Sequence, residues 1–126
     1  MLCYLNDEAG ADNVQDLLLQ SQNNQCDLYM NLVNLAEIYY TIQRHEGLER
    51  ASEVLAIIEN FPMKLEIVNK ELALLAANLK AKFPIALADC FCAATASKYS
   101  ASVVTGDPEF EKLEEQISIM WLPKKS

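Results

Sequence analysis

Apolar and polar positions along the chain follow two periods, and the changes between them predict alternating strands and helices. Short apolar or β-branched runs predict strands at 28–30, 63–68, 101–105 and 117–121. Helical spacing of apolar residues predicts helices at 12–19, 32–43, 48–59, 70–82, 84–99 and 108–114. Alternation of this kind is typical of a parallel sheet covered by helices. We therefore expect an α/β sandwich.

Length and composition indicate one globular domain over residues 1–126. The chain is 52% hydrophobic and has only three glycines and four prolines. It has no apolar run near the roughly 18 residues of a membrane span and no secretory signal pattern. We therefore expect a cytoplasmic protein with no membrane partner. The net charge of −8 disfavours nucleic-acid binding through broad charge attraction, but it is compatible with a nuclease whose acids surround a metal.

The cysteines and the single histidine form no recognisable metal-binding or catalytic motif. Cys90 and Cys92 lie two apart within a predicted helix, so their side chains point in different directions. There is no C-x-x-C pair and only one histidine, His45, in a polar stretch. We expect buried, reduced thiols and no zinc site. A Cys-His or Ser-His nucleophile pair is not expected either.

Three acids stand out because each follows a stretch of sequence without charge, which for Asp107 is the segment 99–106. Asp89 is the only charged residue in the segment 83–97, most of which lies in the alanine-rich predicted helix at 84–99. Asp107 follows a predicted strand in a Gly-Asp-Pro turn, and Glu37 is the only charge in 28–43. In parallel sheets, sites form at the carboxyl ends of strands and the adjoining helix starts. Oxygen ligands collected there predict a Mg²⁺ or Mn²⁺ site.

Each acid also has an ordinary structural interpretation. Glu37 is equally compatible with an exposed position on a largely buried helix. Asp89 would interact favourably with the positive end of its helix dipole. Asp107 precedes Pro108 and is a good candidate to cap a short helix. The residues alone leave these alternatives open.

The sequence LADCFCAATASKYSASVVTGDPEF, at 87–110, resembles the C-terminal half of PIN domains, with their L-A-D-x-x-x-A-A-T-A and V-T-x-D segments. NLAEIYY, at 34–40, resembles the second acidic motif of that family, and 4–18 resembles its first helix and the loop beside it. The resemblance covers nearly the whole chain and is greatest to VapC-type toxin ribonucleases. It implies a three-layer α/β/α sandwich with a central parallel sheet.

The resemblance also implies a function. Such proteins are Mg²⁺- or Mn²⁺-dependent ribonucleases, in which metal-activated water attacks an RNA phosphodiester. Glu37, Asp89 and Asp107 match the second, third and fourth acids that hold the metal, and Thr105 matches a supporting hydroxyl. Glu109 is near enough in sequence to assist, but we place it at the surface. The implied partners are an RNA substrate, a cognate antitoxin of a type II toxin–antitoxin pair and a second copy in a homodimer.

One departure from the family concerns the N-terminus. The family opens with a strand that ends in Asp-Ser or Asp-Thr and lies mid-sheet in the order 3-2-1-4-5, whereas Leu2–Leu5 resembles the segment after it. We therefore expect an N-terminally truncated PIN-like domain that lacks the central strand and the first acid. An active form extended upstream by that strand would restore both. Alternatively, another segment of the chain or another subunit fills the gap.

Two rival functions follow. A catalytically inactive PIN-like remnant, acting as a partner-binding protein, fits the missing first acid. A receiver-like or flavodoxin-like binding domain also requires an α/β sandwich with acids at strand ends. The chain lacks the strand-end Asp and Lys pattern of that class, which disfavours it.

Overall fold

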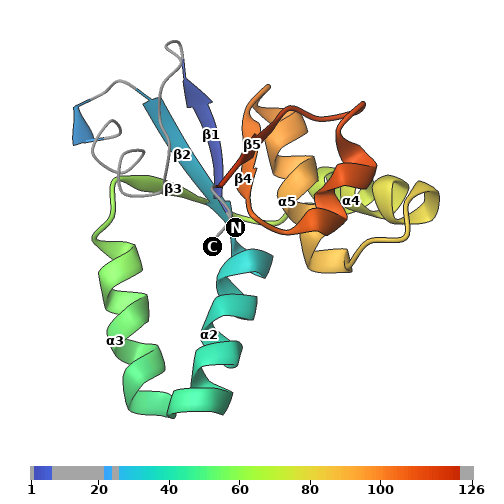
Figure 1. Cartoon of the computed structure of the whole chain (residues 1–126). Helices are drawn as coiled ribbons and strands as arrows, with labels where there is room; N and C mark the ends of the chain where they lie inside the picture. The colour runs from blue at the N-terminus through green and yellow to red at the C-terminus, as the bar shows by residue number, and fades with distance from the viewer. Residues whose placement is uncertain (1, 7–21, 24–25, 123–126) are drawn as a thin grey trace.

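The computed structural model describes residues 2–6, 22–23 and 26–122 (Figure 1). Its strands form one five-stranded sheet in the order β3-β2-β1-β4-β5. The strands are β1 (Leu2–Asn6), β2 (Cys26–Asn31), β3 (Met63–Glu66), β4 (Ser102–Thr105) and β5 (Ile119–Trp121). The helices are α2 (Leu32–Glu46), α3 (Leu48–Glu59), α4 (Lys70–Lys82), α5 (Leu87–Lys98) and the 3₁₀ helix η1 (Pro108–Leu113). The predicted helix at 12–19 lies outside the described residues.

The helix boundaries follow local sequence signals. Gly47 separates α2 from α3 with a positive φ of 91°, a backbone conformation that glycine adopts without strain. Asn69 caps α4, because its side chain accepts a hydrogen bond from the Leu72 amide at 2.9 Å. These boundaries confirm the predictions for α3 and α4 to within a residue.

The α/β class is confirmed, but two details of the predicted sheet are wrong. The central position is filled, because Leu2–Asn6 forms β1 between β2 and β4. The sheet is also not wholly parallel. β1 runs antiparallel to both neighbours, whereas β2 pairs with β3 and β4 pairs with β5 in parallel. The reversed strand satisfies the backbone hydrogen-bonding groups that an absent central strand would leave unpaired.

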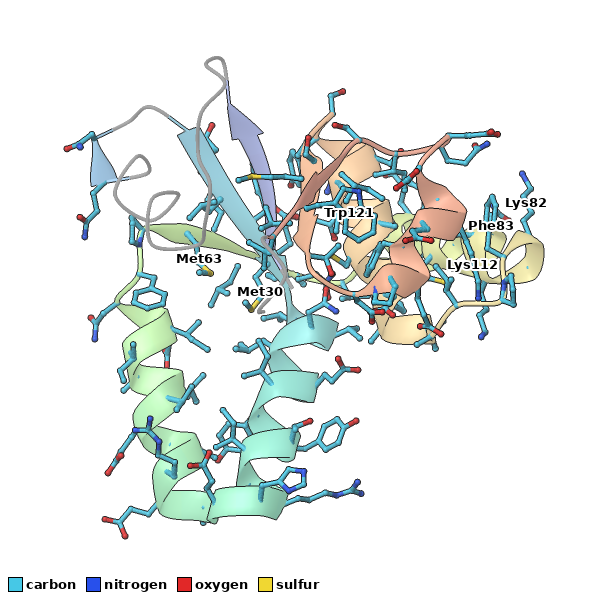
Figure 2. All side chains as sticks on the ribbon, in the orientation of Figure 1. Met30, Met63, Lys82, Phe83, Lys112 and Trp121 are labelled. Carbon is cyan, nitrogen blue, oxygen red and sulfur yellow. The ribbon has the colours of Figure 1, made fainter. Side chains whose placement is uncertain are left out.

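Both faces of the sheet carry buried side chains, as a sandwich requires. Tyr29 and Val103 belong to the main core cluster, on the face covered by α5. Leu28, Met30 and Val104 alternate to the opposite face and are also buried. Met30 and Met63, from neighbouring strands, lie on the side of the sheet that leads towards the α2–α3 hairpin (Figure 2).

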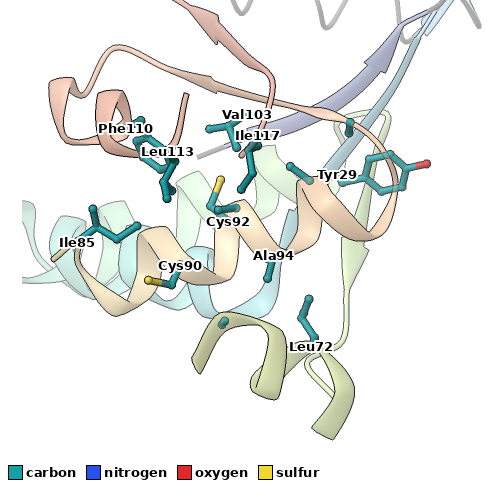
Figure 3. Packing of buried hydrophobic residues seen from close by; sticks show 14 residues of the cluster. Tyr29, Leu72, Ile85, Cys90, Cys92, Ala94, Val103, Phe110, Leu113 and Ile117 are labelled. Carbon is teal, nitrogen blue, oxygen red and sulfur yellow. The ribbon is translucent and has the colours of Figure 1, made fainter. Parts of the chain in front are cut away.

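The main core surrounds α5 (Figure 3). Its alanines allow close approach, so α4 packs along one side of α5 while the sheet and η1 pack against the others. Cys90 and Cys92 are buried in this cluster, as predicted. Most of α5 is therefore enclosed by other elements of the described chain. This packing holds the first turn of the helix, which carries Asp89, in a fixed position.

Both ends of α5 are attached to other elements. Before its first turn, Lys80 of α4 donates a hydrogen bond to the Ile85 carbonyl at 2.6 Å. At its C-terminal end, the Tyr99 ring stacks on Tyr29 of β2 with centroids 4.3 Å apart. The Tyr99 hydroxyl also donates to Glu66 of β3. These contacts restrict movement of α5 relative to the sheet.

Candidate metal centre

Asp89 and Asp107 reach the same place from two consecutive elements. Asp89 lies in the first turn of α5 and is only 6% exposed. Asp107 lies between β4 and η1, two residues beyond the end of the strand. Helix starts and the carboxyl ends of strands meet at one edge of such a sheet, and this explains why the two acids converge.

Glu109 completes a group of three carboxylates with these two aspartates. One ligand atom from each of the three residues lies within 4.8 Å of the others. Glu109 is exposed, as the sequence predicts, but its carboxylate faces the two aspartates. Glu109 lies two residues after Asp107, and the tight turn of η1 brings its side chain back towards the aspartates. The only signal for it in the sequence is the spacing Asp-Pro-Glu.

Burial and neighbouring charge change the acidity of Asp89. Removal from water is the main cause that raises the pKa of Asp89 from 3.8 to about 6. The negative charges of Asp107, Glu37 and Glu109 raise it further, in that order. The free protein therefore holds several carboxylates close together at an electrostatic cost, a common feature of functional sites.

Thr105 and Asp107 form the turn that carries the second aspartate. The buried Thr105 hydroxyl accepts a hydrogen bond from the Asp107 amide at 3.0 Å. Asp107 Oδ1 in turn accepts from the Glu109 amide at 2.9 Å, which caps η1. Asp107 is therefore an N-cap, and its other carboxylate oxygen has no hydrogen bond among the described contacts. The Thr105 side chain therefore supports Asp107 by binding the backbone amide of the aspartate.

Glu37 lies beside this group without belonging to it. Its side chain is half-buried on α2, and its charge acts on Asp89. It is not among the three residues whose ligand atoms come within 4.8 Å of one another in the part of the chain that the structure describes. The structure thus brings Asp89 and Asp107 together and places Glu37 at the margin of the group.

The donor set fits a hard divalent cation. Carboxylate oxygens are the ligands that Mg²⁺ and Mn²⁺ prefer, and Mg²⁺ usually takes only a few of them with water completing its shell. Two oxygens on opposite sides of one Mg²⁺ are about 4 Å apart, given metal–oxygen distances of about 2.1 Å. The three ligand atoms lie within 4.8 Å of one another, which is compatible with binding of a single cation. Besides burial, repulsion from neighbouring carboxylates raises the pKa of Asp89, and a cation would offset that repulsion.

Comparisons with known proteins identify the family of the chain. The family model described as PIN domain matches residues 2–116. A solved structure, the crystal structure of VapBC2 from Rickettsia felis bound to a DNA fragment from their promoter, is similar with a TM-score of 0.69 and 18% sequence identity. The match covers 86% of this chain and 83% of that chain. No curated protein matches. The chain belongs to the PIN domain family.

Proposed function

We propose that this chain is a metal-dependent endoribonuclease, the toxin of a type II toxin–antitoxin pair. The observation that carries the proposal is the convergence of Asp89, Asp107 and Glu109 in a PIN domain, where one buried aspartate has a pKa raised to about 6. Carboxylates held together at such a cost, at the edge of an α/β sheet, are suited to binding a divalent cation.

The residues have distinct proposed roles. Asp89 and Asp107 hold the cation, with Glu37 as a further acid at the margin, and Glu109 joins them from η1. Thr105 keeps Asp107 in place through the hydrogen bond to its amide. A bound Mg²⁺ or Mn²⁺ would polarise the phosphodiester and acidify a water molecule bound to it. The carboxylates, once neutralised, no longer repel the RNA phosphate.

The proposed partners follow from the same comparison. The similar structure from Rickettsia felis contains VapBC2 and a DNA fragment. We propose for this chain an antitoxin partner, a homodimeric state and RNA as the substrate.

No helix in the described ranges 2–6, 22–23 and 26–122 is long and apolar enough to cross a membrane.

The test is cleavage of single-stranded RNA by purified protein with Mn²⁺, with Mg²⁺ and with EDTA. We expect cleavage with either ion and none with EDTA, and an internal cut in a circular RNA to show endonuclease action. Cleavage that persists in EDTA would contradict the metal requirement. Failure to cleave any RNA with either ion would contradict the nuclease assignment for this chain.

One observation favours a second candidate, a non-catalytic PIN domain that binds a partner. Because β1 runs antiparallel, its carboxyl end at Asn6 pairs with Cys26, at the start of β2, and lies away from the acids. The central strand therefore delivers no acid from its C-terminal end to the site. Calorimetric titration with Mn²⁺ separates the two candidates, because a non-catalytic remnant would bind no more ion than a variant that lacks Asp89.

A further inference from the structure

A buried polar network connects α2 to α5 close to the acids. Asn31 caps α2 and accepts a hydrogen bond from the Asn34 amide at 2.9 Å. Its Nδ2 donates to Asn34 Oδ1 at 2.6 Å and to Thr95 Oγ1 at 3.1 Å. Asn34 Nδ2 donates to the Ala88 carbonyl at 2.9 Å. The three polar side chains are no more than 2% exposed.

The network attaches α2 to α5 at two separate levels. Asn34 bonds α5 at Ala88, and Asn31 bonds it at Thr95, seven residues further along. Seven residues span about 10 Å of helix axis. Two attachments at that separation fix both the rotation of α2 against α5 and its position along the axis, whereas one attachment would allow α2 to pivot.

The acids lie beside these attachments. Asp89 directly follows Ala88, whose carbonyl accepts the bond from Asn34. Glu37 is three residues after Asn34, so it lies on the same side of α2 one turn later. The negative charge of Glu37 contributes to the raised pKa of Asp89, so α2 carries this acid near the acid group. The Asn34 hydrogen bond therefore links the backbone next to Asp89 to the turn of α2 that precedes Glu37.

Stability alone does not require polar residues at these positions. A hydrogen bond contributes little net stability, and replacing both partners by apolar groups of the same shape can be nearly neutral. Apolar contacts are non-directional, whereas hydrogen bonds define distances and angles. A fully satisfied buried network gives the two helices one relative geometry.

We propose that Asn34, together with Asn31 and Thr95, forms a positioning network that holds α2 and α5 in the geometry needed to bind a divalent cation. The inference rests on the proposed metal site. Asn34 and Thr95 touch no substrate or ion themselves, and they act through the backbone positions of Asp89 and Glu37.

The experiment measures Mn²⁺ affinity by calorimetry and melting temperature by circular dichroism for Asn34→Ala, Thr95→Val and Thr95→Ser. Thr95→Val keeps the side-chain shape but removes the acceptor for Asn31, and Thr95→Ser retains it. The matched control is Asn69→Ala, because Asn69 makes the same kind of capping bond at 2.9 Å on α4. It belongs to no part of the acid group.

We expect Asn34→Ala and Thr95→Val to raise the Kd for Mn²⁺ about tenfold, the effect usual for residues that orient metal ligands. Thr95→Ser should restore most of the affinity. Asn69→Ala should lower the melting temperature and leave the Kd within about twofold of wild type, since its cap contributes stability only.

Folded Asn34→Ala and Thr95→Val proteins that bind Mn²⁺ as wild type would overturn the proposal, as would an equal loss of affinity in Asn69→Ala. If Asn34→Ala does not fold, Thr95→Val decides. A wild-type protein that binds Mn²⁺ but cleaves no RNA overturns the nuclease function and leaves the network test valid. A wild-type protein that binds no Mn²⁺ overturns both.

Discussion

The carboxylates of Asp89 and Glu109 lie within 4.8 Å of each other, although one side chain is buried on α5 and the other is exposed on η1. This arrangement brings the start of α5 close to the turn that follows β4. Glu109, and not Glu37, is thus the third acid in the group of described residues that could hold a metal ion together. The exposed acid on η1 therefore has a specific place in the site.

Glu109→Gln should weaken Mn²⁺ binding about tenfold, because a neutral amide oxygen attracts the cation less than a carboxylate does. Calorimetry on the metal-free protein measures the change. Glu111→Gln is the matched control, since Glu111 is exposed on the same 3₁₀ helix but lies outside the group of three. Equal affinities in Glu109→Gln and wild type would remove Glu109 from the site.

The raised pKa of Asp89 predicts how the stability of the metal-free protein depends on pH. Between about 4 and 6 the folded state binds the proton that the unfolded state releases, so this aspartate makes stability fall as pH rises through that window. At pH 7 the cost reaches at most about 3 kcal/mol, from a pKa shift of about two units.

Asp89→Asn removes that cost, because the amide is neutral at every pH in the window. We expect the variant to be more stable than wild type at pH 7 in EDTA and the difference to vanish near pH 4. Urea unfolding at several pH values measures it. A difference that does not change with pH would show that Asp89 keeps an ordinary pKa in the fold.

The close packing of α5 predicts intolerance of larger side chains. Ala94 is fully buried and faces the side of α5 that packs near Leu72 of α4 (Figure 3). Ala94→Leu should destabilise the protein by about 1–3 kcal/mol through overpacking. Ala77→Leu is the control, because Ala77 is exposed on α4, and it should change stability little. Thermal unfolding of both variants compares them, and equal stabilities would contradict the close packing.

The reversed direction of β1 predicts which residues can be cross-linked. Tyr4 pairs with Ser102 in the antiparallel register, so the double variant Tyr4→Cys, Ser102→Cys should form a disulfide under mild oxidation. In that register Leu2 pairs with Val104, so Leu2→Cys with Ser102→Cys should not cross-link. Peptide mapping by mass spectrometry reads out the bond. The opposite preference would contradict the direction of β1.

Local signals predicted much of this fold. Gly47 and Asn60 bracket α3, and the capping bond of Asn69 begins α4, so their bounds follow from residues close in sequence. Asp89 and Asp107 are identifiable because each follows a stretch of uncharged sequence, 83–88 and 99–106. Their convergence is the part of the site that sequence reasoning anticipated.

Long-range relationships were not predictable in the same way. The direction of β1 depends on pairing with β2 and β4, and a five-residue strand carries no signal for its orientation. The hydrogen bond from Asn31 to Thr95 joins residues 64 positions apart. Glu109 reaches the aspartates only because η1 is a tight 3₁₀ turn. Each depends on tertiary packing, which the periodicity of the chain does not encode.

The central claim is that Asp89 takes part in metal-dependent RNA cleavage. The most direct measurement is the rate at which wild type, Asp89→Asn and the control Glu111→Gln cleave single-stranded RNA at saturating Mn²⁺, with each protein first shown to be folded. We predict that Asp89→Asn loses cleavage by at least about a hundredfold, because an amide supplies no charge to the cation. Glu111→Gln should cleave as wild type does. Unchanged cleavage by Asp89→Asn would contradict the account.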